Sequence, residues 1–82
     1  MFRRWRFVAC VCGDENVLKK AKKIKRYIEK HLGTRVECKL EMQIGDFETD
    51  TFDMYMRLTE NEAAFVRGLT DTEGFHERAL KD

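Results

Sequence analysis

The chain contains no proline and no serine among its 82 residues, and it has only three cysteines. Without serine, no mechanism that uses a serine nucleophile is possible. Three cysteines cannot all pair within one chain, and such a sparse, odd number favours a reducing compartment over a secreted disulfide scaffold. These absences lead us to expect a cytoplasmic protein.

The sequence also lacks long apolar segments. A membrane-spanning helix needs about 20 consecutive apolar residues. The apolar stretch from Phe7 to Cys12 is too short even for a signal peptide, so we expect no membrane partner. The hydrophobic content of 43% is nevertheless sufficient for a packed core. We expect residues 1–82 to form one domain, because a chain of this length cannot build a second core.

Charge is distributed unevenly along the chain. Residues 1–39 contain twelve Lys and Arg against four Asp and Glu, a net charge of +8. Residues 40–82 contain four against eleven, a net charge of −7, so the formal total of +1 hides a strong polarity. Such a split is typical of molecules that meet their partners through charged surfaces.

The first half of the sequence predicts a strand followed by a long helix. Residues 5–12 are mostly strand formers and are apolar on both faces from Phe7 onward, which is typical of a strand covered on two sides. Residues 14–32 carry apolar side chains at three- and four-residue steps, which predicts an amphipathic helix. Asp14 is the expected N-cap and Gly33 the expected stop.

The second half predicts a β-hairpin and two shorter helices. Residues 34–44 alternate apolar and polar, residues 45–50 resemble a turn, and residues 52–58 return with the same alternation. Thr59 and Glu62 have the spacing of a capping box, which opens a short helix over residues 63–69. Gly68 and Thr70 are expected to end that helix, and a last helical segment follows over residues 72–80.

This β-α-β-β-α(α) order predicts an α+β domain. The expected architecture is a three-stranded mixed sheet with helices packed mainly on one face, like a truncated ferredoxin-like fold. The favoured arrangement places the third strand between the first and the second. The alternative keeps the strands in sequence order.

The cysteines and histidines could suggest a metal site or a nucleophile. Cys10, Cys12 and Cys38 supply three thiols, but a helix that returns antiparallel to the first strand carries His31 away from Cys12, and the alternation puts Cys38 in the core. No spacing links His31 or His76 to a cysteine. We interpret the cysteines as core residues, and we expect no metal, no cofactor, no catalytic residue and no enzyme.

An acidic segment surrounds the hairpin turn. Its members are Asp46, Glu48, Asp50 and Asp53. Their spacing resembles the opening of a calcium loop, but Thr51 stands where that loop requires glycine and Arg57 where it ends in glutamate. We interpret the segment as an acidic edge that could contact a protein or imitate nucleic-acid phosphates.

A basic surface is the strongest functional signal. It combines one face of the long helix with the N-terminal arm, and its members are Lys19, Lys22, Lys23, Arg26, Lys30, Arg3, Arg4 and Arg6. Glu29 is the single acidic residue on this helix face, so the charge of the face is more one-sided than solubility requires. Such a surface could bind phosphates.

A second signal is an aromatic sheet face. If Val8 joins the core, the opposite face of the sheet carries Trp5, Phe7, Tyr55 and Arg57. RNA-binding sheets stack bases on such rings, but neither ribonucleoprotein consensus is present. Acidic residues of the strands share the face, so it is equally suited to a protein interface, unless the C-terminal segment covers it.

Two hypotheses follow for the function. The first is a non-enzymatic protein-binding module, an inhibitor or adaptor that uses the charged faces and the aromatic sheet face. In size and in its lack of catalytic residues the chain is similar to anti-CRISPR proteins, the phage-encoded inhibitors of bacterial defence nucleases, although no motif matches a particular family. The alternative is a nucleic-acid-binding protein that uses the basic surface. A homodimer joined through opposite charges is a third, weaker hypothesis.

Overall fold

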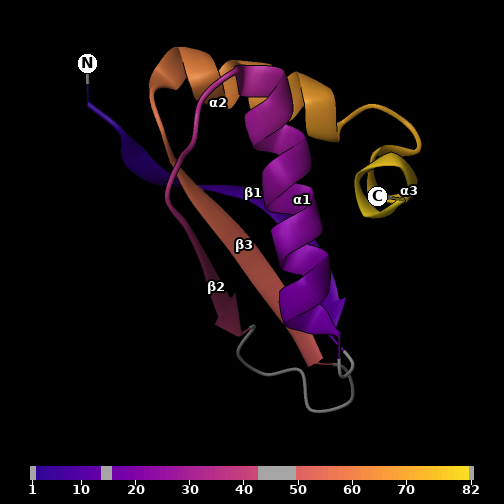
Figure 1. Ribbon diagram of the computed structural model, residues 1–82. Coiled ribbons are helices and arrows are strands. Elements are labelled where there is room, and N and C mark those ends of the chain that lie inside the picture. The colour runs from indigo at the N-terminus through magenta and orange to yellow at the C-terminus, as the bar shows by residue number, and fades with distance from the viewer. Residues whose placement is uncertain (1, 14–15, 43–49, 82) are drawn as a thin grey trace.

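The computed structural model describes residues 2–13, 16–42 and 50–81 of this α+β domain. Within these ranges the chain forms three strands and three helices (Figure 1). Their bounds are β1 (Arg4–Gly13), α1 (Val17–Leu32), β2 (Cys38–Met42), β3 (Asp50–Leu58), α2 (Glu60–Thr70) and α3 (Phe75–Leu80).

The strands form one sheet in the order β1-β3-β2, which confirms that the third strand lies between the first two. β3 is antiparallel to both neighbours, with Arg4 opposite Leu58 and Cys38 opposite Met56. The prediction of a mixed sheet is therefore wrong. β1 and β2 run in the same direction, but β3 separates them, so no parallel pair forms.

The three helices all lie on one face of the sheet, as predicted (Figure 1). The apolar stripe of α1 buries Ile24 and Ile28 completely, and the central strand β3 buries Met54, Met56 and Leu58 on the same side. The core is thus a single layer between helices and sheet, because each element has one apolar side to remove from water.

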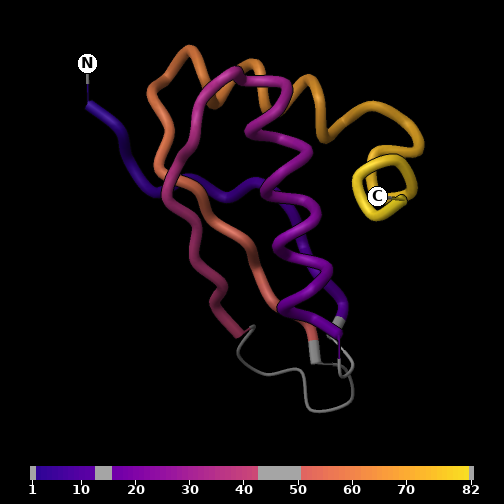
Figure 2. The backbone as a smooth tube through the Cα atoms, in the orientation of Figure 1, coloured from indigo at the N-terminus to yellow at the C-terminus, as the bar shows by residue number. Residues whose placement is uncertain are grey.

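The C-terminal segment belongs to this helix layer. Phe75 of α3 is buried, and its ring meets the ring of Tyr27 of α1 edge-on at 5.7 Å. Figure 2 shows the segment lying beside α1. The prediction of a last helix over residues 72–80 is correct in type, but the helix starts at Phe75. None of the described helices covers the opposite face of the sheet, which we call the open face.

A β-bulge at Val8 changes which side chains of β1 are buried. It inserts one extra residue opposite β3, so that Val8 and Ala9 both face the helices. Beyond the bulge, Cys10 and Cys12 project from the open face and are exposed. The prediction that these two cysteines are core residues is therefore wrong, because it assumed strict alternation along the strand. Cys38 is half-buried and packs against the core, as predicted.

The long helix is shorter at its N-terminus than predicted. α1 begins at Val17 with Asn16 at the N-cap, and the expected cap residue Asp14 lies outside the described residues. Gly33 ends the helix as predicted. It has a φ of 77°, and its N–H donates to the Glu29 carbonyl at 2.8 Å.

The capping box of α2 is confirmed, and the helix ends at Thr70, one of the two predicted breakers; the predicted break at Gly68 is wrong. The Thr59 side chain accepts from the Glu62 N–H while the Glu62 carboxylate accepts from the Thr59 N–H. The helix continues through Gly68 to Thr70, because packing of residues such as Val66 outweighs the weak helix propensity of one glycine. No described helix is long and apolar enough to span a bilayer.

The second strand starts later than predicted. Its described part begins at Cys38 rather than Thr34, while the predicted end at Ile44 and most of the turn lie outside the described residues. Before the strand, Val36 is buried and its N–H donates to a Glu29 carboxylate oxygen at 3.0 Å. This bond ties the connection to α1 instead of to a strand. β3 already includes Asp50, which was expected in the turn.

Candidate functional site

The open face brings together side chains from all three strands. Phe7 on β1, Tyr55 on β3 and Lys39 on β2 lie in one row across the sheet. In the next row Trp5 lies opposite Arg57. Trp5, Phe7, Tyr55 and Arg57 therefore share one face, because residues two apart on a strand point to the same side.

Aromatic rings and cations form a cluster on this face. The Phe7 and Tyr55 rings pack edge-to-face with centroids 6.0 Å apart. The Lys39 ammonium lies 4.7 Å from the Trp5 ring centre and 5.7 Å from the Tyr55 ring centre. The Arg57 guanidinium lies 5.9 Å from the Trp5 ring centre. Cation–π contacts at these distances stabilise the positions of the Trp5 and Tyr55 rings. The cluster nevertheless stays accessible, since 41% of Trp5 and 54% of Phe7 are exposed.

Lys39 was not among the predicted site residues. It alternates outward on its strand like its neighbours, so its sequence position alone does not distinguish it from a solvating lysine. Only the strand order, which places β2 next to Tyr55, shows that this ammonium contacts two rings.

Carboxylates balance the cations of the open face. Glu37 pairs with Arg57 at 3.3 Å and Glu41 with Lys39 at 3.1 Å. Asp53 accepts a hydrogen bond from the Cys10 thiol at 3.6 Å. Partial burial, followed by the Asp53 carboxylate, raises the pKa of Cys10. Among the described residues, the face therefore has both signs of charge and no excess of cations.

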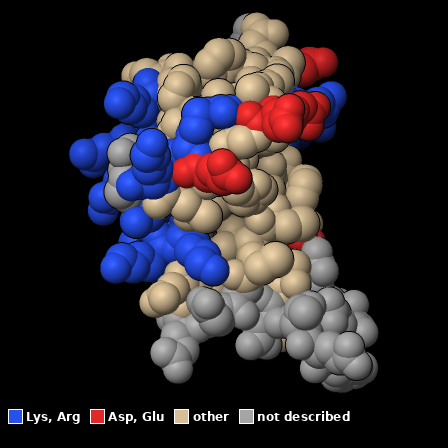
Figure 3. All heavy atoms as spheres, turned by 90° about the vertical axis from the view of Figure 1, so that its right-hand side faces the viewer, with Lys and Arg blue, Asp and Glu red and all other residues tan. Residues whose placement is uncertain are grey.

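The predicted basic helix face is present on the other side of the molecule. We call it the α1 stripe, and its residues are Lys19, Lys22, Lys23, Arg26 and Lys30. All but Lys23 are exposed, and viewed from the α3 end Lys and Arg gather along the side of α1 (Figure 3). Lys23 donates to the Leu80 carbonyl at 3.3 Å. In the described ranges the other four make no ion pair, since Glu29 is engaged by Val36.

Two further cations join the α1 stripe at its C-terminal end. Lys25 and Arg35 line a shallow hollow of about 490 Å³ together with Lys22, Arg26 and Glu29. Arg35 was not predicted to belong to this surface, because its sequence position indicated a strand residue that faces water. In the structure Arg35 lies in the connection that folds back along α1.

The arginines of the N-terminal arm do not extend this stripe. Arg3 pairs with Glu62 of α2 at 3.0 Å, and the Arg6 Nε donates to the Leu58 carbonyl at 3.2 Å. Arg4 and Arg6 line a depression beside the start of α2. The predicted basic surface is thus divided between α1 and the N-terminus of α2.

The predicted acidic edge is only partly described. Asp46 and Glu48 lie outside the described residues, as does the side chain of Asp50. Asp53 belongs to the open face, beside Cys10. In the parts of the chain that the structure describes, no three His, Cys, Asp or Glu side chains gather in a way that could hold a metal ion.

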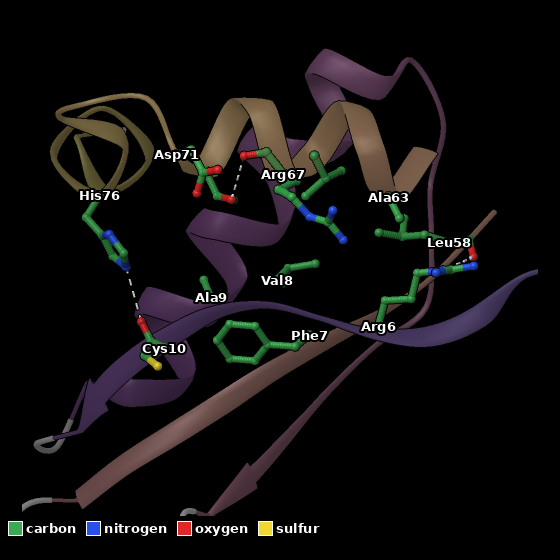
Figure 4. A pocket seen from close by; sticks show the side chains of 12 residues that line it. Arg6, Phe7, Val8, Ala9, Cys10, Leu58, Ala63, Arg67, Asp71 and His76 are labelled. Atoms are coloured by element: carbon green, nitrogen blue, oxygen red, sulfur yellow. Dashed lines mark hydrogen bonds between the residues drawn. The ribbon is translucent and has the colours of Figure 1, made fainter. Parts of the chain in front are cut away.

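A hollow between β1 and α2 was not predicted. It has a volume of about 640 Å³, and five consecutive residues of β1, Arg6 to Cys10, line its floor. Figure 4 shows α2 above this groove, with Arg67 pointing from the helix into it. At one end the His76 Nε2 donates to the Cys10 carbonyl at 3.1 Å. The residues come from four elements, β1, β3, α2 and α3, so no local pattern in the sequence could reveal the groove.

Neither histidine contacts a thiol in a way that suggests catalysis. His31 is exposed and lies 2.8 Å from the Tyr27 carbonyl, one helical turn earlier. His76 contacts the backbone of Cys10 rather than its sulfur.

Comparison with protein-family models, curated proteins and solved structures finds no match to this chain.

Proposed function

We propose that this protein is a non-enzymatic binding module that acts on another protein as an inhibitor or adaptor. The observation that carries the proposal is the open face. It presents Trp5, Phe7 and Tyr55 as one ring cluster, fixed by Lys39, with no described helix packed over it. Aromatic residues and arginine are enriched in protein interfaces and supply most of their binding energy.

The charges of the open face favour a protein over a nucleic acid. Lys39 and Arg57, its cations in the described ranges, are paired with carboxylates, and Asp53 adds a further negative charge beside the cluster. A phosphate backbone would be repelled by these acids. A protein surface of mixed charge can instead form new ion pairs with these residues, and such ion pairs orient the two proteins relative to each other.

The experiment compares capture of partners by matched variants. Trp5→Ala with Tyr55→Ala removes the two rings beneath Lys39, whereas Phe65→Ala removes an equally exposed ring from α2. Nuclease-treated lysate of the source organism is passed over each protein, and bound proteins are quantified by mass spectrometry. We expect at least one protein partner to be retained by wild type and Phe65→Ala but reduced about tenfold or more by the ring variant. Equal capture by all three would contradict the proposal.

A second candidate function, nucleic-acid binding, is favoured by the α1 stripe. Lys19, Lys22, Arg26 and Lys30 project from one side of α1 without an ion pair in the described parts of the chain. With about 1.5 Å of rise per residue, these cations extend over roughly 16 Å, enough to meet several phosphates of one strand. The binding would be largely independent of base sequence, since phosphates carry no sequence information.

Salt dependence tests this second candidate. Lys22→Glu with Arg26→Glu should weaken binding of a 20-base-pair duplex and make the slope of log affinity against log salt shallower by about 2. Arg67→Glu with Lys81→Glu changes the net charge equally at positions outside the stripe and should alter the slope much less. If both pairs of substitutions act alike, binding follows net charge and the α1 stripe has no special role.

A further inference from the structure

The register of the sheet shows where backbone groups of β1 point. The Arg57 N–H donates to the Glu37 carbonyl at 3.0 Å, so the backbone of Arg57 faces the β2 side of β3. Its partner on β1, Trp5, therefore belongs to a non-hydrogen-bonded pair, and so does Phe7, two residues further on. The N–H and C=O groups of Trp5 and Phe7 consequently point away from β3, toward the outer edge of the sheet.

Two observed bonds support this assignment. Beyond the bulge, Cys10 and Cys12 occupy the equivalent outward positions, and their carbonyls accept bonds from the His76 ring and the Lys20 ammonium. Side chains thus cover the C-terminal half of this edge, as proteins commonly do to block strand pairing. None of the described residues bonds to the outward groups of Trp5 or Phe7.

The groove under α2 lies along the same edge. Its floor is the edge of β1 from Arg6 to Cys10, and Ala63 of α2 forms part of its roof (Figure 4). In a complete ferredoxin-like sheet a fourth strand pairs with β1 at this position. The groove therefore lies where such a strand would pair, and Phe7, whose backbone groups point outward, is on its floor.

We propose that an extended acidic segment of a partner protein adds to the sheet as a strand beside Trp5 and Phe7. Main-chain bonds to these two residues supply affinity, as in other cases of strand addition. The intervening residue of the partner faces α2, where the groove presents Arg6 and Arg67 against the single carboxylate of Asp71. An acidic side chain fits that position, while its neighbours lie on the open face beside the ring cluster.

A second copy of the chain fits the edge less well. Two β1 edges related by a two-fold axis would pair Trp5 with Phe7 and set Arg6 directly opposite Arg6 of the other copy. Cα atoms in such a pair are only about 4.5 Å apart, and like charges directly opposite one another destabilise the pairing. The arginine therefore disfavours self-association and favours an acidic partner.

Peptides of defined chemistry test this inference, which rests on the proposal that the protein binds another protein. The probe is a capped seven-residue peptide of alternating valine and glutamate. Its matched controls replace glutamate by lysine, or keep the side chains but carry N-methyl groups on alternate amides, which removes the main-chain donors. Binding to the isotope-labelled protein is followed by NMR shifts and by amide hydrogen exchange.

We expect the glutamate peptide to slow exchange of the Trp5 and Phe7 amides at least tenfold. The lysine and N-methylated peptides should bind at least tenfold more weakly, and Arg67→Glu should bring the affinities of the glutamate and lysine peptides together or reverse them. Unchanged Trp5 and Phe7 exchange at millimolar glutamate peptide would overturn the inference.

Two other outcomes would separate this inference from the proposed function. Shifts confined to Tyr55 and Lys39, with exchange of the β1 amides unchanged, would refute strand addition and leave binding by the open face intact. Light scattering that shows a dimer, dissociated by the peptide, would identify a second copy as the occupant and overturn the acidic partner. Protected β1 amides together with normal partner capture by the ring variant would instead remove the ring cluster from the binding site.

Discussion

At the residue scale, the bulge at Val8 determines which side chains of β1 are buried. It buries two consecutive small apolar side chains, those of Val8 and Ala9. It also turns Cys10 and Cys12 toward the open face. The sequence of this segment does not reveal the bulge, because residues 7–12 are apolar on both faces and either register would bury apolar side chains.

Methionines of one sheet provide a test of burial at the residue scale. Met56 is completely buried on β3, whereas Met42 on β2 is 66% exposed. Met56→Ala should lower the free energy of unfolding by about 2–5 kcal/mol, since it removes buried methylene groups and leaves a cavity. Met42→Ala should change it by less than about 0.5 kcal/mol.

Urea unfolding followed by circular dichroism measures both variants. The comparison holds the residue type and the sheet constant, so that it isolates burial. Equal losses of stability in the two variants would contradict the described packing of β3.

At the scale of elements, the ends of α2 show what local patterns can predict. The capping box depends on two residues three positions apart and was predictable, because its bonds are local. The predicted break at Gly68 did not occur, because the tertiary packing of Val66 carries α2 past Gly68 to Thr70. Local signals thus identified the cap of this helix, while a single glycine was a poor indicator of where it ends.

The capping box makes a prediction for stability. Thr59→Ala removes the oxygen that accepts from the Glu62 N–H at 3.1 Å. The loss of this cap should lower the free energy of unfolding by about 1 kcal/mol. Thr70→Ala at the other end of α2 is the matched control and should have a smaller effect, since its hydroxyl donates only to the Arg67 carbonyl. Chemical denaturation measures both, and an effect of Thr70→Ala as large as that of Thr59→Ala would contradict the role of the cap.

The same box predicts a pH dependence. The Thr59 N–H, followed by the Arg3 guanidinium, lowers the pKa of Glu62 in the folded state. Its stabilising contribution is therefore fully present above the ordinary glutamate value of about 4.3 and is lost as the pH falls through the lowered folded value. Glu62→Gln should flatten this part of the curve in thermal melts between pH 2 and 6. Parallel curves for the variant and wild type would contradict the shift.

At the scale of the whole molecule, the two candidate surfaces lie in different layers. The α1 stripe projects from the helix layer, and the ring cluster lies on the opposite face of the sheet. Substitutions at sites that share no partner are additive in general. Substitutions in one surface should therefore not change binding by the other.

This independence is testable with the variants already described. Trp5→Ala with Tyr55→Ala should leave duplex affinity within about twofold of wild type, because free energies at separate sites add to within about 0.5 kcal/mol. Lys22→Glu with Arg26→Glu should likewise leave capture of the protein partner unchanged. Fluorescence anisotropy and quantitative capture provide the two measurements. If either variant impairs both activities, the surfaces act as one site or the fold itself is affected.

The sequence alone determined the order of elements, the single core, the amphipathic face of α1 and the charge of its outer side. These properties depend on residue spacing and composition, which hydrophobic periodicity reports directly. Only the tertiary structure decided the purely antiparallel sheet and the exposure of Cys10 and Cys12. It also separated Arg3 and Arg6 from the α1 stripe and placed Lys39 over two rings. Those features depend on register and on which distant strands become neighbours, and residue spacing within one segment carries no information about either.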